Sequence, residues 1–171
     1  VGFLTPSIQT FSLNSTDINV TVPAGNYKPD YVFIIFKDKS LANSSQVNSC
    51  LNSNGDIQSL QINLGGEMYP SIAQQARWGS NFVNQFYEQY KDCVVKLTGE
   101  CSMSLQEYRD LYPIFAFDLT AQSIKVKNLS TQVNVIGKRN SGTPELNMYV
   151  IVLYEKFYSA QYLRNEVLPK S

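Results

Sequence analysis

Strand-length segments rich in apolar residues recur along this chain, and they constrain its fold more than any other feature. Residues 31–36 and 146–155 are almost continuously apolar, as is typical of strands in the middle of a sheet. Residues 8–13, 18–22, 57–64 and 132–136 instead alternate apolar with polar side chains, as half-buried strands do. Turn-forming residues separate these segments. The sequence therefore predicts seven or eight strands in a two-sheet antiparallel sandwich.

The first two of the alternating segments are joined by a short turn at residues 14–17, which predicts either a hairpin or a bent continuation of one strand. Residues 37–56 lose all periodicity and predict a long exposed loop. Residues 137–145 predict a second exposed turn, with Lys138 and Arg139 solvated in it. We expect this loop and this turn to be exposed or contact elements.

The stretch 101–122 contains a helix start followed directly by a breaker. Ser104 and Glu107 fit the capping box, in which two side chains satisfy free backbone N–H groups of the first helical turn. Pro113 ends the helix and favours an extended Tyr112. A single short helical turn is therefore predicted here.

An aromatic run follows this breaker and predicts a strand buried on both faces. Phe115 and Phe117 are expected to pack into the core. Asp118 closes the run, and we expect it to cap the next turn or to bond backbone amides.

Residues 81–93 predict the long helix of the chain, capped by Ser80. Its apolar face has helical spacing and consists of Phe82, Val83, Phe86, Tyr90 and Cys93. Residues 94–97 are expected to be a short extended piece. One helix and uneven loops favour a jelly roll over an immunoglobulin sandwich. The predicted fold is an all-β antiparallel sandwich of jelly-roll type, one domain over residues 1–171, with one inserted amphipathic helix, a short helical turn and a candidate arm at 159–171.

The chemistry of the side chains argues against an enzyme. The sequence has no histidine, which excludes Ser-His-Asp and Cys-His catalysis and histidine-ligated zinc. Three cysteines without a CxxC predict reduced structural thiols, and neither a disulfide framework nor a metal site. Glu107 and Asp110 share a helix face, where solvated carboxylates are a better interpretation than an acid–base pair. No cofactor is expected.

Two aromatic residues offer a candidate ligand platform. Trp78 and Tyr69, with Arg77, could stack a sugar, although packing of Trp78 on the nearby helix is the favoured interpretation. Four N-x-S/T sequons, at Asn14, Asn19, Asn43 and Asn128, would suit a secreted carbohydrate- or receptor-binding sandwich. That class is the alternative to an intracellular product.

Charge and hydropathy restrict the partners. The chain has 14 basic and 14 acidic residues, so it lacks the net positive charge on which non-specific nucleic-acid binding depends. No apolar run approaches the roughly 18 residues that a membrane-spanning helix needs. We therefore expect neither direct nucleic-acid binding nor a membrane span.

At the stretch 101–122 the chain resembles the major capsid proteins of Polinton/Maverick elements, adintoviruses and virophages. The resemblance lies in an acidic-Tyr pair on a short helix, Glu107-Tyr108, before a Tyr-rich strand that ends in Phe-Asp-Leu-Thr, here residues 117–120. Flanking features agree in order, from the first strands to the closing strand at 146–156. These proteins carry two jelly rolls, and the chain resembles the C-terminal one; the turn at 137–145 departs from the pattern.

The resemblance implies a structural role without turnover of a substrate. Such proteins form homotrimers with a pseudo-hexagonal outline, which tile an icosahedral shell together with other capsid proteins. It also implies synthesis in the host cell and a place in the virion. One alternative is that the chain is a stand-alone single-roll protein, such as a penton or minor capsid protein, rather than one half of a longer capsid protein.

Overall fold

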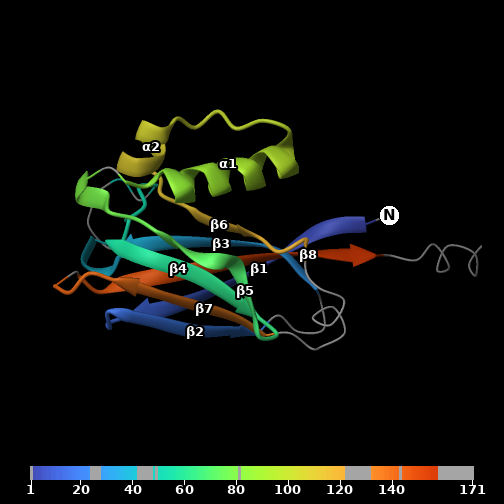
Figure 1. Ribbon diagram of the computed structural model, residues 1–171, viewed down its shortest axis with the longest axis horizontal. Helices are drawn as coiled ribbons and strands as arrows, with labels where there is room; N and C mark the ends of the chain where they lie inside the picture. The colour runs from blue at the N-terminus through green and yellow to red at the C-terminus, as the bar shows by residue number, and fades with distance from the viewer. Residues whose placement is uncertain are drawn as a thin grey trace, which may run out of the picture.

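The computed structural model describes residues 2–23, 28–41, 48, 50–80, 82–121, 132–142 and 144–157. Within these residues, eight strands form two four-stranded antiparallel sheets that pack face to face (Figure 1). We name each sheet after one central strand. The β8 sheet has the order β1 (Gly2–Leu13), β8 (Leu146–Phe157), β3 (Pro29–Asp38) and β6 (Phe115–Asp118). The β7 sheet has the order β2 (Asp17–Pro23), β7 (Gln132–Arg139), β4 (Ile57–Leu64) and β5 (Glu67–Gln75).

The strand pairing is nested, and this nesting defines the fold. β1 pairs with β8, β2 with β7, β3 with β6 and β4 with β5, all antiparallel. Two further pairings, β3 with β8 and β4 with β7, complete the two sheets. The chain is thus one long hairpin of four strand pairs wound into a sandwich, which is the jelly-roll arrangement. The predicted all-β jelly-roll sandwich is confirmed.

The core lies between the sheets, because alternate side chains of each strand point inward. The central strand β3 contributes Val32, Ile34 and Phe36, all fully buried. Facing side chains come from both sheets and are also fully buried: Leu60, Ile62, Leu64, Val133, Val135, Met148 and Val150. Each such side chain contributes roughly 1.5–3 kcal/mol of burial free energy.

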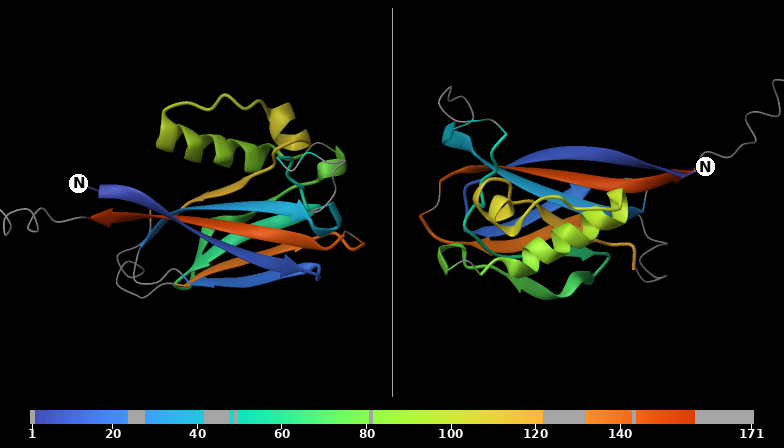
Figure 2. Two further views of the ribbon diagram at one scale, coloured as in Figure 1. Left: turned by 180° about the vertical axis from the view of Figure 1, so that it is seen from behind. Right: turned by 90° about the horizontal axis from the view of Figure 1, so that it is seen from above.

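Two helices are inserted between β5 and β6, and they lie over β6 at one side of the sandwich (Figures 1 and 2). They are α1 (Asn84–Thr98) and α2 (Leu105–Asp110). Phe86, Tyr90 and Cys93 form the buried face of α1. Short 3-10 turns follow β3 (η1, Lys39–Leu41) and β5 (η2, Trp78–Ser80).

The predicted start and end of the long helix are wrong. Backbone hydrogen bonds in both directions between Arg77 and Phe82, of 2.9 and 3.1 Å, hold Phe82 outside the helix, where it is 51% exposed. Ser80 therefore lies in η2 and does not cap α1, whose N-cap is Val83. The segment 94–97 is helical, because the chain reverses only at Gly99, which has a φ of +89°.

Of the two alternatives predicted for the turn between β1 and β2, the bent continuation is correct, because these strands lie in different sheets. Two other strands differ from their predictions. β7 continues to Arg139 although residue 137 is a glycine. β5 was not predicted, because its sequence carries Pro70 and several polar residues. The candidate arm at 159–171 lies outside the described residues.

The sequence predicts no helix that spans a membrane. Over the described ranges, none of the helices has both the length and the apolar character that crossing a bilayer requires.

Candidate assembly surfaces

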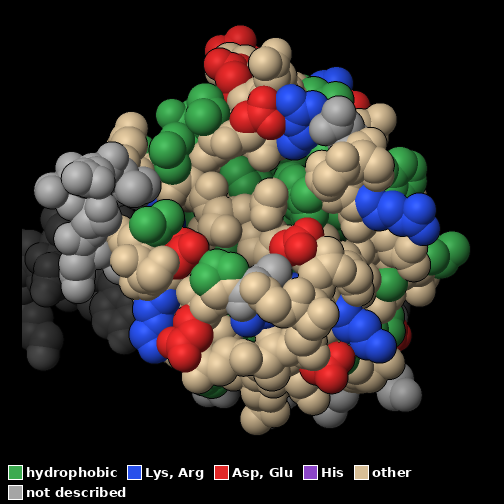
Figure 3. Space-filling model, turned by 90° about the vertical axis from the view of Figure 1, so that its left-hand side faces the viewer, with side chains coloured by type: hydrophobic (Ala, Val, Ile, Leu, Met, Phe, Trp, Pro, Cys, Tyr) green, Lys and Arg blue, Asp and Glu red, His purple; other side chains and the backbone are tan. Residues whose placement is uncertain are grey.

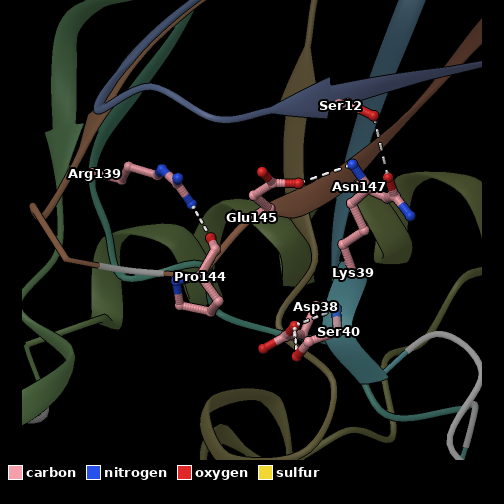
Figure 4. Close-up of polar contacts among 8 residues, drawn as sticks. All are labelled: Ser12, Asp38, Lys39, Ser40, Arg139, Pro144, Glu145 and Asn147. Carbon is pink, nitrogen blue, oxygen red and sulfur yellow. Dashed lines mark hydrogen bonds and ion pairs between the residues drawn. The ribbon is translucent and has the colours of Figure 1, made fainter.

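The two segments expected to make contacts lie together at one end of the sandwich. Lys39, just after β3, donates from Nζ to the Glu145 carboxylate at 2.8 Å, and the Lys39 N–H donates to the Glu145 carbonyl oxygen at 3.0 Å (Figure 4). Both side chains of this ion pair are about half exposed, so it contributes at most about 1 kcal/mol. The ion pair mainly fixes positions, because it links the end of β3 to the start of β8. We call the end of the molecule that carries residues 14–16, 38–41, 50–56, 139–142 and 144–146 the loop end.

Arg139 holds two turns of the loop end together. Its guanidinium donates to the Pro144 carbonyl oxygen at 2.8 Å (Figure 4). The guanidinium also donates to the Ser15 carbonyl oxygen at 2.8 Å, and the backbone N–H donates to the Thr16 carbonyl oxygen at 2.9 Å. The residue is only 5% exposed. The prediction that Lys138 and Arg139 form a solvated turn is therefore wrong for Arg139, whereas Lys138 is exposed within β7.

Residues 51–56 are half-buried against neighbouring elements, contrary to the prediction of a fully exposed loop. Ser53 donates its N–H to the Phe36 carbonyl oxygen at 2.8 Å, and Asn52 donates to the carbonyl oxygen of Leu111 at 2.9 Å. Gly55 has a φ of +60°, and a Cβ there would lie 2.8 Å from Leu146 Cδ1. Seen from the loop end, hydrophobic side chains lie in a central hollow surrounded by charges of both signs (Figure 3).

The structure does not bring the candidate ligand platform together. Trp78 packs its ring on Phe115, with centroids 6.0 Å apart, and donates its indole N–H to the Ile57 carbonyl oxygen at 2.9 Å. Tyr69 lies near the other end of β5, roughly 20 Å away along the strand, where its hydroxyl donates to Glu67 at 2.8 Å. Both residues are thus used in packing and local hydrogen bonds.

The stretch that carries the family resemblance forms the side of the core next to α1. Phe115 is fully buried and makes edge-on ring contacts with Phe36 at 5.4 Å, Phe86 at 4.9 Å and Trp78. Phe117 is fully buried as well, and Tyr112 is half-buried just after α2. A short strand therefore joins the β8 sheet to the helix layer through one aromatic ring.

Asp118 ends this strand and fixes the turn beyond it. Its carboxylate accepts hydrogen bonds from the Thr120 N–H at 2.9 Å and the Thr120 hydroxyl at 2.6 Å, and from Lys96 of α1. Partial burial opposes ionisation, but the hydrogen bonds from Lys96 and Thr120 outweigh it and hold the pKa of Asp118 below its usual value. Asp118 thus ties α1 to β6.

Tyr108 of α2 and Cys93 of α1 are two buried titratable groups in the helix layer. Tyr108 is fully buried, donates its hydroxyl to the Ile114 carbonyl oxygen at 3.0 Å and packs on Tyr90; burial raises its pKa. Burial also raises the pKa of Cys93 to about 12, which keeps this thiol protonated and unreactive. Leu105 and Leu111 lie at helical spacing from Tyr108 but are exposed, so the spacing of these three residues did not indicate which one is buried.

The acidic residues of α2 do not form a reactive pair. They line an open hollow of about 460 Å³ with Ser104, Gln106 and Leu111. Backbone and side-chain hydrogen bonds with Ser104 lower the pKa of Glu107, and the hydrogen bond from Arg109 lowers the pKa of Asp110. Nowhere in the described part of the chain do three His, Cys, Asp or Glu side chains gather as metal ligands.

The two outer faces of the sandwich differ in chemistry. On the β8 sheet, register places Ile8 opposite Ile151, and Ile151 opposite Phe33, all pointing away from the core. We define the apolar face as Leu4, Ile8, Phe33, Ile35, Ile151 and Leu153. On the β7 sheet the equivalent outward positions are largely amides and hydroxyls: Asn19, Thr21, Gln61, Asn63, Gln132 and Asn134.

The edge strand β5 carries a wide bulge. Leu60 pairs with Gln74 and Ile62 pairs with Tyr69, so that four residues of β5 lie opposite Gln61 alone. Gln61 donates to the Pro70 carbonyl oxygen at 2.8 Å and thereby supports the loop. Ile72 lies in this β5 bulge (residues 70–73) and is 82% exposed.

Comparisons with known proteins leave the family of this chain open. No protein-family model matches it, and no curated protein matches it in sequence. Among solved structures it is similar to the major capsid protein P2 from Bacteriophage PM2, with a TM-score of 0.45 and 10% sequence identity. The similarity covers 94% of this chain and 46% of that chain, so this chain spans less than half the length of the phage protein.

Proposed function

We propose that this chain is a jelly-roll domain of a viral or transposon capsid protein and that its work is structural. The observation that carries the proposal is the position of the family-like stretch in the fold. Residues 101–122 supply α2 and then β6, the strand that pairs with β3 in the nested series of a jelly roll. The residues that resemble major capsid proteins therefore include a strand of the jelly roll itself, which supports the proposal.

The proposed mechanism is non-covalent association of preorganised surfaces. At the loop end, Arg139 and the pair Lys39–Glu145 join turns from both sheets. Such cross-links lower the conformational entropy that a loop loses on binding, so contacts made there cost less free energy. We propose that copies associate as homotrimers, joined to other capsid proteins in the virion.

We also propose that the chain has no catalytic activity. The sequence lacks histidine, and Glu107 and Asp110 already serve the capping box and the ion pair with Arg109. Trp78, the best candidate for sugar stacking, is used in the core. These assignments favour a structural protein over a carbohydrate-binding sandwich.

At the finer level, we propose the C-terminal roll of a double-jelly-roll major capsid protein of the Polinton, adintovirus and virophage group. A stand-alone single-roll penton or minor capsid protein is the competing possibility. The gene that encodes this chain distinguishes the two, because the double-roll protein requires a second jelly-roll-sized region upstream of it.

The test is the oligomeric state of the complete gene product. Light scattering coupled to size-exclusion chromatography is expected to give three times the chain mass, and electron microscopy a pseudo-hexagonal outline. A product that stays monomeric at high concentration and forms no shell would contradict the capsid proposal. A pentamer would instead support the penton.

A further inference from the structure

Asn54 and Gly55 form the only Asn-Gly pair in the sequence, and they lie in a tight turn of the loop end. Gly55 and Asp56 are the central residues of this turn, with φ angles of +60° and +48°; positive φ at both positions is typical of a type I′ turn. The Ile57 N–H closes the turn by donating to the Asn54 carbonyl oxygen at 3.2 Å. The structure thus fixes the backbone on both sides of the Asn54–Gly55 peptide bond.

An Asn-Gly pair can react with itself, because glycine has no side chain to hinder its nitrogen. In this reaction the Gly55 nitrogen gives up its proton and attacks Asn54 Cγ. The new N–Cγ bond closes a succinimide ring, the bond from Cγ to the side-chain nitrogen breaks, and this nitrogen takes up a proton and leaves as ammonia. Water then opens the ring at either carbonyl, so that aspartate or isoaspartate remains at position 54. The sum is hydrolysis of a side-chain amide, without oxidation or reduction.

The folded turn opposes this reaction. Ring closure brings Asn54 Cβ into line with the Gly55 nitrogen, and this backbone torsion lies outside the regions that strands, turns and helices occupy. Two hydrogen bonds add to the barrier. Gly55 donates the N–H that must be deprotonated to Ser53 Oγ at 3.1 Å, and Asp56 donates its N–H to Asn54 Oδ1 at 2.9 Å, which holds the side-chain amide. The turn must therefore open before the ring can form.

Neighbouring strands keep the turn closed. Ser53, just before it, donates its N–H to a carbonyl oxygen of β3 at 2.8 Å. Asn140 donates its N–H to the Asp56 carbonyl oxygen at 3.1 Å, and Ile57 pairs in register with Arg139 of β7. Opening of this turn is thus coupled to the contacts that Arg139 makes at the loop end.

We propose that Asn54–Gly55 is a latent deamidation site, which the folded loop end protects and which reacts when that end opens. Asn54 is only half-buried, so water reaches it once the turn is released. Loops open locally at a lower free energy than the whole domain unfolds, so the reaction does not require global unfolding. The inference is independent of the proposed function, because only this turn and water take part.

The reaction also makes opening permanent. Isoaspartate carries the main chain through Cβ and adds one methylene to the turn, so the hydrogen bond from Ile57 cannot form again with the same geometry. The turn has no space for a longer chain, because Gly55 is buried and even a Cβ there would lie 2.8 Å from Leu146 Cδ1. Deamidation therefore marks molecules whose loop end has opened and stabilises their opened state.

The first experiment compares the reaction in folded and unfolded protein. The chain is incubated at mildly alkaline pH with and without guanidinium chloride, and peptide mapping by mass spectrometry measures aspartate and isoaspartate at position 54. We expect the folded protein to react at least about 10-fold more slowly, equivalent to about 1.4 kcal/mol of opening free energy. Equal rates would overturn the proposed protection. The absence of reaction in the unfolded chain would overturn the site itself.

The second experiment loosens the turn without changing the reacting pair. Ser53→Ala removes the acceptor of the Gly55 N–H, and Arg139→Met weakens the strand beside the turn. Each is expected to raise the rate in the folded protein about 5-fold or more. Lys138→Met, on the exposed side of the same strand, is the matched control and should react as wild type does.

Circular dichroism checks that each of these variants is folded during the incubation. In guanidinium chloride all variants are expected to react at the wild-type rate, which assigns any difference to the fold. If folded Ser53→Ala and folded Arg139→Met both react at the wild-type rate, the proposal is overturned.

The third experiment separates the added charge from the lengthened backbone. Asn54→Asp carries the charge of the product on a main chain of normal length. The purified isoaspartate form is expected to unfold at a lower guanidinium concentration than Asn54→Asp. Identical unfolding midpoints would overturn the conclusion that deamidation stabilises the opened state.

Discussion

The outer faces of the two sheets have the same pleated geometry and opposite chemistry. Ile8, Ile151 and Phe33 lie side by side across the β8 sheet, whereas Thr21, Asn134 and Asn63 occupy the corresponding row of the β7 sheet. A sheet that faces water needs apolar residues on one side only. This difference indicates that the two layers are adapted to different surroundings, with the β8 sheet suited to burial on both sides.

The layers also differ in what holds them. In the β8 sheet, β6 is joined to the helices through aromatic packing around Phe115. In the β7 sheet, close backbone approach at Gly137 and the carbonyl bonds of Arg139 stand out. Substitutions in the two sheets therefore test whether aromatic packing stabilises the β8 sheet and whether backbone contacts stabilise the β7 sheet.

The largest effect is expected for Phe115→Ala, which removes the ring at the centre of the β8-sheet packing. The free energy of unfolding should fall by about 3–5 kcal/mol, because a cavity remains among Phe36, Phe86 and Trp78. Urea denaturation followed by circular dichroism measures it. Phe115→Leu should lose clearly less, and equal losses from both variants would argue against the packing explanation.

Arg139→Met is expected to come next and tests the β7 sheet at the loop end. The carbonyl oxygens of Ser15 and Pro144 lose their donor in a nearly solvent-free site, which should cost about 1–3 kcal/mol of unfolding free energy. Lys138→Met on the exposed side of the same strand is the control, with a change within about 0.5 kcal/mol. Similar losses at both positions would remove Arg139 from its assigned role.

Gly137→Ala probes the close contact between β7 and β4. The added Cβ would clash with the Ser59 carbonyl oxygen and lie 2.7 Å from Leu60 Cδ1, so the backbone must shift, at a cost of about 1–2 kcal/mol. Gly79→Ala is the matched control, since a Cβ there meets nothing within 4 Å. Thermal unfolding of both variants decides the point, and a neutral Gly137→Ala would weaken the contrast between the sheets.

The smallest effect is expected for Asp118→Asn, which tests the ion pair between Lys96 of α1 and the β8 sheet. Because the Lys96 side chain is 55% exposed, the loss at neutral pH should be about 1 kcal/mol or less. The pKa of Asp118 is lowered in the folded state, so its contribution is present above about pH 4 and is lost as the pH falls through the folded-state pKa. Unfolding free energies of wild type and variant measured from pH 7 to pH 2 should converge at the acid end; a constant difference would exclude this cause.

Local patterns in the sequence were enough for the sandwich and most of its strands. Continuous apolar runs marked β3 and β8, and the capping box marked α2, whose Ser104 and Glu107 make both expected bonds. β5 carried no such pattern, because Pro70 and the bulge interrupt its pairing. The helix α1 was predicted to start too early, since the spacing of Phe82 fits the apolar helix face although a backbone bridge to Arg77 holds it in a turn before the helix.

The candidate surfaces were harder to predict than the fold. Arg139 has the sequence context of an exposed turn, and only the approach of residues 15 and 144 buries it. The apolar face depends on register between strands far apart in the chain, such as Ile8 and Ile151. No local window contains that information, whereas the burial of Phe115 and Phe117 followed from the apolar run itself.

The nested pairing has a consequence for synthesis of the protein. β8 lies between β1 and β3, so the sheet that contains all three cannot close until the ribosome has released residues 146–157. Until then β1 and β3 have unpaired edges next to apolar side chains, the condition under which nascent chains aggregate or recruit chaperones. Contacts between such distant segments also slow folding. The order of translation therefore makes completion of this sheet a late step in the folding of these eight strands.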